Sequence, residues 1–340
     1  MLAFVASASV SLAAPSGCLM VKVAELPVKF ERNRPLVPVS INGKPGWFLI
    51  DTGAGKSMMF GGAATEYGLG QSTASHATFL GVGGAQDANF VNVAEFGLSD
   101  VKVKNLRLYA IGHRGTAQEA GLLGRDFLSK FDLEFDLANK MLRLWQPQNC
   151  GQRNLAYWTK DPQTSELSQY EDGAEYEVKI LVNGKAINAI LDSGATTSVV
   201  TADTAASAQV KQQDYASDSS ISAGIGEKAV PTRTATFDEV VIGDEQVKHA
   251  KLRIADLFVD DKASATGSML QHSIDAHLPP MLLGADFLRS HRVLLAAKQH
   301  RLYFTYSGGP IFQVVGDAVQ PQLAADETSV PPAPTLAPRK

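Results

Sequence analysis

The sequence predicts a protein of two related halves, each organised around a β-hairpin, and two observations support this. The tetrapeptide Asp-Thr-Gly-Ala at 51–54 follows an apolar run, and Asp-Ser-Gly-Ala at 192–195 follows another one later in the chain. Asn-Gly pairs at 42–43 and 183–184 precede the two aspartates by the same interval. Asn-Gly between apolar runs predicts a hairpin, because both residues accept the positive φ of a type I′ turn. In each half, the second strand of the hairpin therefore ends at the aspartate.

Two further motifs are repeated in the same order. Gly-Val-Gly-Gly at 81–84 corresponds to Gly-Ile-Gly at 224–226, and Leu-Leu-Gly-Arg-Asp-Phe-Leu at 122–128 corresponds to Leu-Leu-Gly-Ala-Asp-Phe-Leu at 282–288. The spacing between the copies grows from the first motif to the last, which indicates an insertion in the second half, placed at 256–280. Three motifs duplicated in order argue for an internal repeat rather than coincidence.

These residues resemble the retropepsin-like aspartic proteases, in the single-chain bacterial form that fuses two halves. The resemblance covers 28–146 and 175–306. It implies an all-β fold with two pseudo-twofold-related β-barrel lobes, each with a flap hairpin and one or two short helices. The expected organisation is a first lobe at 18–146, a linker at 147–173 and a second lobe at 174–307.

The resemblance also implies roles for individual residues. Asp51 and Asp192 would be the catalytic pair, and Asp126 and Asp286 are expected to be N-caps of short helices. The implied supporting residues of the dyad are Thr52, Gly53, Ser193 and Gly194, and the flap residues that would bind substrate are Gly81, Val82, Gly83, Gly84, Gly224, Ile225 and Gly226.

Two carboxyl groups about 3 Å apart cannot both ionise, so they share a proton, and one can act as base while the other acts as acid. This chemistry requires no cofactor and no metal, and the scattered histidines show no metal-ligand spacing. Ala54 and Ala195 stand where a hydroxyl could donate a hydrogen bond to each carboxylate. The charged form then loses one stabilising hydrogen bond, and the resemblance implies that this substitution goes with a weakly acidic working pH, so we expect optimal activity at about pH 5–7 rather than near pH 3.

The first residues of the chain and its net charge indicate the compartment and the kinds of partner to expect. Residues 1–17 resemble a secretory signal peptide, although the basic segment that usually begins one is missing. We therefore expect export, to a bacterial periplasm or outside the cell. The net charge of −4 gives no electrostatic case for nucleic acid, and no apolar run in the mature chain is long enough to cross a membrane. The Pro- and Ala-rich tail at 308–340 is expected to be disordered at its end.

The only two cysteines are Cys18 and Cys150. The fold implied by the resemblance brings the ends of the first lobe together, so these cysteines are expected to form a disulfide. Two unpaired thiols remain the alternative.

Two functions fit these features. The leading hypothesis is an endopeptidase that cuts polypeptide in an extended conformation and works as a monomer, because one chain supplies both halves. The alternative is a catalytically degenerate protein of the same fold that binds peptides or acts as a scaffold. Intact copies of both Asp-hydroxyl-Gly motifs favour catalysis. A homodimer in which each half pairs with a partner chain is disfavoured.

Overall fold

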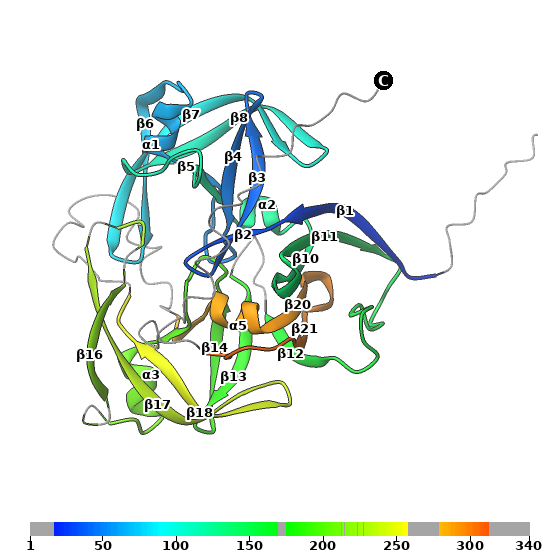
Figure 1. The fold of residues 1–340 in the computed structure, drawn as a ribbon, viewed down its shortest axis with the longest axis vertical. Helices are drawn as coiled ribbons and strands as arrows, with labels where there is room; N and C mark the ends of the chain where they lie inside the picture. Colours follow the sequence, from blue (N-terminus) through cyan, green and yellow to red (C-terminus); the bar gives the residue numbers. More distant parts are fainter. Residues whose placement is uncertain are drawn as a thin grey trace, which may run out of the picture.

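The computed structural model describes residues 17–168, 175–211, 213, 215–222, 224–226, 228–257 and 279–312. Its strands form one 8-stranded and one 13-stranded sheet, and they build two lobes of similar design (Figure 1). The predicted all-β fold of two lobes is confirmed. The predicted signal peptide, except for Gly17, lies outside the described residues, as do most of the insertion and most of the tail.

The first lobe is a closed barrel that begins with the predicted hairpin. Asn42 and Gly43 have φ values of 51° and 79°, as a type I′ turn requires. Strand pairing runs from β3 through β4, β9, β5, β8 and β7 and returns to β3, while β6 pairs with β7 to form a long hairpin. The elements are β2 (Lys29–Glu31), β3 (Arg34–Ile41), β4 (Lys44–Ile50), β5 (Met58–Phe60), α1 (Gly61–Glu66), β6 (Gln71–Gly81), β7 (Gly84–Leu98), β8 (Val101–Ile111), β9 (Gly121–Leu123) and α2 (Arg125–Leu128).

The second lobe repeats this pattern. Asn183 and Gly184 form the equivalent turn, with φ values of 46° and 76°. Pairing runs from β13 through β14, β19, β15, β18 and β17 back to β13, with β16 added to β17. The elements are β13 (Glu177–Val182), β14 (Lys185–Leu191), β15 (Val199–Val200), α3 (Ala202–Ser207), β16 (Tyr215–Ser222), β17 (Val230–Ile242), β18 (Glu245–Ile254), β19 (Met281–Leu283) and α5 (Ala285–Ser290).

A six-stranded layer joins the lobes, in the order β1-β11-β10-β20-β21-β12. Its central pair, β10 and β20, contributes one strand from each half. The segment at 147–173 that was expected to be a linker supplies β12 to this layer. The elements are β1 (Leu19–Pro27), β10 (Asp132–Asp136), β11 (Met141–Gln148), β12 (Gln163–Ser168), β20 (His291–Ala296), β21 (Arg301–Tyr306) and the 3₁₀ turns η1 (Leu137–Asn139) and η3 (Ala297–Gln299).

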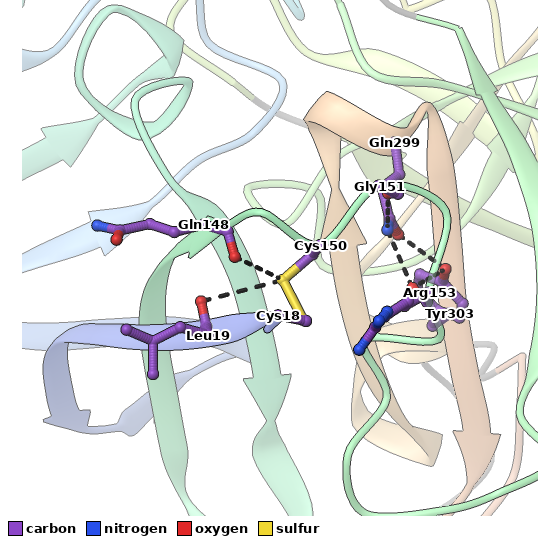
Figure 2. Close-up of a disulfide and its surroundings, with 8 residues drawn as sticks. All are labelled: Cys18, Leu19, Gln148, Cys150, Gly151, Arg153, Gln299 and Tyr303. Carbon is purple, nitrogen blue, oxygen red and sulfur yellow. Dashed lines mark hydrogen bonds between the residues drawn. A yellow bond between two sulfur atoms is a disulfide. The ribbon is translucent and has the colours of Figure 1, made fainter. Parts of the chain in front are cut away.

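The disulfide closes one edge of this layer. Cys18 precedes β1, Cys150 follows β11, and the two sulfurs are bonded, which confirms the predicted pairing (Figure 2). Leu19 lies opposite Gln148 in the neighbouring ladder, so the bond fastens together two strands that already pair.

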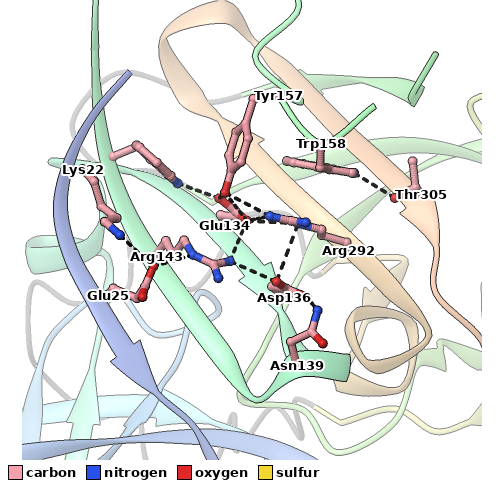
Figure 3. Close-up of polar contacts among 11 residues, drawn as sticks. Lys22, Glu25, Glu134, Asp136, Asn139, Arg143, Tyr157, Trp158, Arg292 and Thr305 are labelled. Atoms are coloured by element: carbon pink, nitrogen blue, oxygen red, sulfur yellow. Dashed lines mark hydrogen bonds and ion pairs between the residues drawn. The ribbon is translucent and has the colours of Figure 1, made fainter. Parts of the chain in front are cut away.

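A buried carboxylate lies on β10, near the centre of the layer (Figure 3). Glu134 is completely buried and accepts hydrogen bonds from Arg143 (2.9 Å), Arg292 (2.6 Å) and the indole of Trp145 (2.7 Å). The hydroxyl of Tyr157 donates to it as well. Arg143 comes from the first half and Arg292 from the second, so the side chain of Glu134 links the two halves. The pairing of β10 with β20 links them through the backbone.

The helices are short. Among the residues that the structure describes, no helix has both the length and the apolar character needed to span a bilayer.

Candidate active site

Asp51 and Asp192 stand at equivalent ends of two buried strands. The apolar residues of β4 and β14 fix these strands in the barrel cores, and each strand pairs in parallel with the Leu-Leu segment of its own half. The N–H of Asp51 donates to Leu123 O (3.0 Å), and the N–H of Asp192 donates to Leu283 O (2.9 Å). The same backbone bond therefore holds each aspartate just beyond its strand.

The two aspartates meet across the lobes. A β-carbon built on Gly53 would lie 2.5 Å from Cγ of Asp192, and one built on Gly194 would lie 2.5 Å from Cγ of Asp51. Each loop thus passes directly against the carboxyl group of the other half, where a larger residue has no room.

Burial and mutual repulsion favour the protonated form of this pair. Removal from water and the negative charge of Asp51 together raise the pKa of Asp192 to about 7, although the amides of Gly194 (2.8 Å) and Ala195 (3.1 Å) oppose the shift. Burial also raises the pKa of Asp51, against a hydrogen bond from the amide of Ala54 (2.9 Å). The pair therefore keeps a proton at a pH where ordinary carboxyl groups are ionised.

The hydroxyls of Thr52 and Ser193 join the two loops. Thr52 Oγ1 donates to Leu191 O, and Ser193 Oγ donates to Ile50 O, each at 2.6 Å. In return, the amide of Thr52 donates to Ser193 Oγ (3.1 Å), and the amide of Ser193 donates to Thr52 Oγ1 (2.9 Å). Both side chains are fully buried, so each half completes hydrogen bonds that the other half needs.

Each aspartate loop is also supported by a second carboxylate of its own half, Asp126 in the first and Asp286 in the second. Asp126 accepts from the amide (2.8 Å) and hydroxyl (2.6 Å) of Ser57, and Asp286 accepts from the same groups of Ser198 (2.9 and 2.7 Å). The expectation that Asp126 and Asp286 are N-caps is wrong. The N-caps are Gly124 and Gly284, and both carboxylates bind back to the serine that follows the aspartate loop.

Comparison with known families agrees with the two-lobed architecture. The model of the family described as "Aspartyl protease" matches residues 37–127 and 178–287, which together make up more than half of the chain. The chain belongs to the aspartyl protease family. The two matched regions correspond to the two lobes, so this aspartyl protease carries both halves in one polypeptide. No curated protein matches the chain.

Hairpin tips from the two lobes touch in this member of the family. Val82 and Gly83 turn between β6 and β7, and residues 224–226 lie between β16 and β17. The amide of Gly226 donates to Val82 O, and the amide of Lys228 donates to Gly83 O, both at 3.0 Å. Gly83 has a φ of 88°, which favours glycine in the turn. The predicted flap residues are thus brought together at the hairpin tips.

The side chains at the tips cross between the lobes. Val82 packs against an apolar cluster of the second lobe, and so does Ala195 of the Asp192 loop. Ile225 packs against the main core cluster, beside Gly81 of the first flap. The tips therefore close against the walls of the opposite lobe.

Three residues that support the aspartate loops, Ser57, Ser198 and Arg125, were not predicted from the sequence. Ser57 and Ser198 are separated by the same interval as the two aspartates, a signal that was present in the repeat. Arg125 has no such signal, because its counterpart is Ala285. The buried Arg125 guanidinium donates to Thr52 O (3.1 Å) and Gly53 O (2.6 Å), so it supports the first aspartate loop, whereas Ala285 cannot do the same for the second.

Proposed function

We propose that this protein is an aspartic endopeptidase whose active site lies between the two lobes, with Asp51 and Asp192 as the catalytic pair. The observation that carries the proposal is the reciprocal approach of Gly53 to Asp192 and of Gly194 to Asp51. It makes one site from two carboxyl groups that belong to different halves of the sequence.

In the proposed reaction, a water molecule lies between the two carboxyl groups. The ionised carboxylate takes a proton from the water, whose oxygen attacks the peptide carbonyl carbon, while the protonated carboxyl group donates its proton to the carbonyl oxygen. The tetrahedral intermediate then breaks its C–N bond as a proton passes to the nitrogen. The products are a carboxylic acid and an amine, and no covalent bond to the enzyme forms.

The flaps suit a polypeptide in an extended conformation. They are β-hairpins with glycines at the tips, so they can bend to admit a chain and then pair with it as an added strand. Their closed contacts must open first, because the amides of Gly226 and Lys228 are engaged with the other flap. We propose that the protein acts as a monomer, since one chain supplies both halves.

Export is part of the proposal. The Cys18–Cys150 disulfide favours an oxidising compartment, and residues 1–17 have the pattern of a secretory signal. A bacterial periplasm or the cell exterior fits both features. The working pH is proposed to be about 5–7, because the dyad must hold one proton and the pKa of Asp192 is raised to about 7.

The test compares the wild type with Asp51→Asn and Asp192→Asn on a peptide library, with cleavage products identified by mass spectrometry. Either substitution should reduce cleavage by about 10²–10⁴-fold or more while the circular dichroism spectrum is retained. Wild-type protein that binds peptides but cuts none, with binding unchanged in both variants, would support the alternative of a degenerate peptide-binding protein.

A further inference from the structure

A cavity of about 180 Å³ lies between the flap of the second lobe and the wall of the first. One side is the flap tip at 224–226, another is the segment at 111–114 that leaves β8, and Gln86 of β7 completes the lining. One wall of the cavity is the tip of the second flap, and the other belongs to the first lobe. The cavity therefore keeps this form only while the second flap is closed against the first lobe.

Arg114 is the only arginine or lysine among the cavity residues, and it has unused hydrogen-bonding capacity. Its guanidinium stacks on the ring of Phe60, 4.9 Å from the centroid. Within the part of the chain that the structure describes, the guanidinium forms no hydrogen bond or ion pair with another residue. A guanidinium carries five N–H donors in a planar fork that suits a carboxylate. Arg114 is exposed to solvent and can therefore offer these donors to an anion at the edge of the cavity.

The charges around Arg114 also favour binding of an anion. Glu119 attracts Arg114, but Glu119 is already paired with Arg34 (2.9 Å), and both Arg34 and Arg32 repel Arg114. Lys29 lies near the same glutamate and near Glu31, which Arg32 contacts (3.8 Å). Arg114 is thus acted on by two cations and by one carboxylate that is already paired, so its surroundings favour a further anion.

We propose that this cavity is a substrate subsite for an acidic side chain, held by Arg114. The inference rests on the proposed function, because the cavity lies against the tip of the second flap, beneath which the peptide substrate is proposed to bind. Ile111 and Ile225 line the same cavity, so they can contact the methylene groups of a glutamate while its carboxylate meets Arg114. A bound glutamate would touch both the first lobe and the second flap, and would therefore hold that flap closed.

The experiment places a single glutamate at each position of a cleaved peptide in turn and compares kcat/KM with the matched glutamine peptide. At one position, wild type should favour glutamate about tenfold. Arg114→Gln should reduce this preference to about one, and Arg114→Lys should keep part of it. Arg107→Gln is the matched control: Arg107 also lies on an aromatic ring, but it stands within β8 and outside the cavity lining. It should keep the full preference.

A second arm separates this inference from the proposed function. Fluorescent forms of the same peptide pairs are titrated into Asp192→Asn protein, where binding is measured without turnover. The glutamate peptide should bind about tenfold more tightly, and Arg114→Gln in that background should abolish the difference. Equal binding and equal cleavage of every glutamate and glutamine pair, or a preference that survives Arg114→Gln, overturns the subsite. Absence of cleavage by wild type together with a glutamate preference in binding overturns the proposed function and leaves the subsite supported.

Discussion

Gly53 of the first lobe and Asp192 of the second are so close that a β-carbon on the glycine would lie 2.5 Å from the carboxyl carbon of the aspartate. No side chain can occupy that space unless the carboxyl group or the loop moves. The reciprocal contact between Gly194 and Asp51 has the same distance. The glycine of each Asp-hydroxyl-Gly motif therefore serves the aspartate of the other half.

Gly53→Ala should reduce peptide cleavage by about 10²-fold or more, because a displacement of about 1 Å at the reacting groups is that costly. Gly55→Ala is the control, since the nearest atom to a β-carbon there is Arg125 Nη2 at 3.5 Å, an ordinary contact. Initial rates on one peptide, together with melting temperatures, measure both. Equal activity of the two variants would show that the close approach does not matter.

The shared hydroxyls should be coupled energetically. Thr52→Val and Ser193→Ala should each lower the free energy of unfolding by about 1–3 kcal/mol, because each leaves buried groups of the other half without partners. The double variant should lose less than the sum by at least about 0.5 kcal/mol.

Urea denaturation provides these values, with Thr78→Val as the control. Thr78 is exposed, and its hydroxyl donates to Asp87 on the neighbouring strand. This change should stay within about 0.5 kcal/mol of wild type. Additive losses at Thr52 and Ser193 would argue that the two loops are independent.

The dyad should make the protein less stable as pH rises. Because the pKa of Asp192 is raised above its usual value to about 7, the folded protein holds more protons than the unfolded chain between about pH 4 and 7. The free energy of unfolding therefore falls as pH increases through this window. Asp192→Asn removes the repelling charge, so at pH 8 its melting temperature should exceed that of wild type by about 2–5 °C.

At pH 4 this difference should shrink, because wild type is then largely protonated at the dyad. Asp100→Asn, on an exposed turn between β7 and β8, serves as the control. A variant that is less stable than wild type at pH 8, or a difference that does not change with pH, would contradict the raised pKa.

The disulfide should stabilise the layer between the lobes. It closes a loop with a sequence separation of 132 residues, so Cys150→Ser should lower the free energy of unfolding by about 2–5 kcal/mol. Dithiothreitol should lower the melting temperature of wild type and leave that of Cys150→Ser unchanged. If reductant had equal effects on both proteins, the stabilisation would have another source.

The buried carboxylate of Glu134 should contribute strongly to joining the halves. Arg143 and Arg292 share two buried carboxylates, Glu134 and Asp136; Glu134→Gln removes the charge of the first and should cost about 2–5 kcal/mol in urea denaturation. Glu166→Gln is the matched change at an exposed ion pair (68% exposed side chain) and should cost about 0–1 kcal/mol. Similar losses in the two variants would mean that the cluster in Figure 3 adds nothing specific.

Short sequence patterns predicted the hairpins, because these depend on the backbone geometry of neighbouring residues. The Asn-Gly turns at 42–43 and 183–184 require positive φ, so the sequence alone indicated both hairpins and the strands that end at Asp51 and Asp192. The resemblance to a known family supplied the two-lobed fold and the pairing of Cys18 with Cys150. The position of the catalytic pair remains a prediction, supported by the approach of Gly53 to Asp192.

Contacts between distant residues could not be read from the chain in the same way. Glu134 and Arg292 meet because β10 and β20 pair across the halves, and neither residue belongs to a repeated motif. Asp126 appeared to be a helix cap because it stands near a helix start, but its real partner, Ser57, lies 69 residues earlier. Arg125 has no counterpart in the second half, so the repeat could not reveal it.

The central claim is that Asp51 and Asp192 titrate as one unit that keeps a shared proton near neutral pH. Carbon-13 NMR of labelled aspartate carboxyl groups, recorded from pH 3 to 9, tests this directly, with Asp51→Asn used to assign the signal of Asp192. In wild type, one carboxyl group should titrate near pH 7, and its midpoint should fall in Asp51→Asn, where the repelling charge is gone. Two carboxyl groups already ionised at pH 6, or a midpoint for Asp192 that Asp51→Asn does not change, would contradict the account.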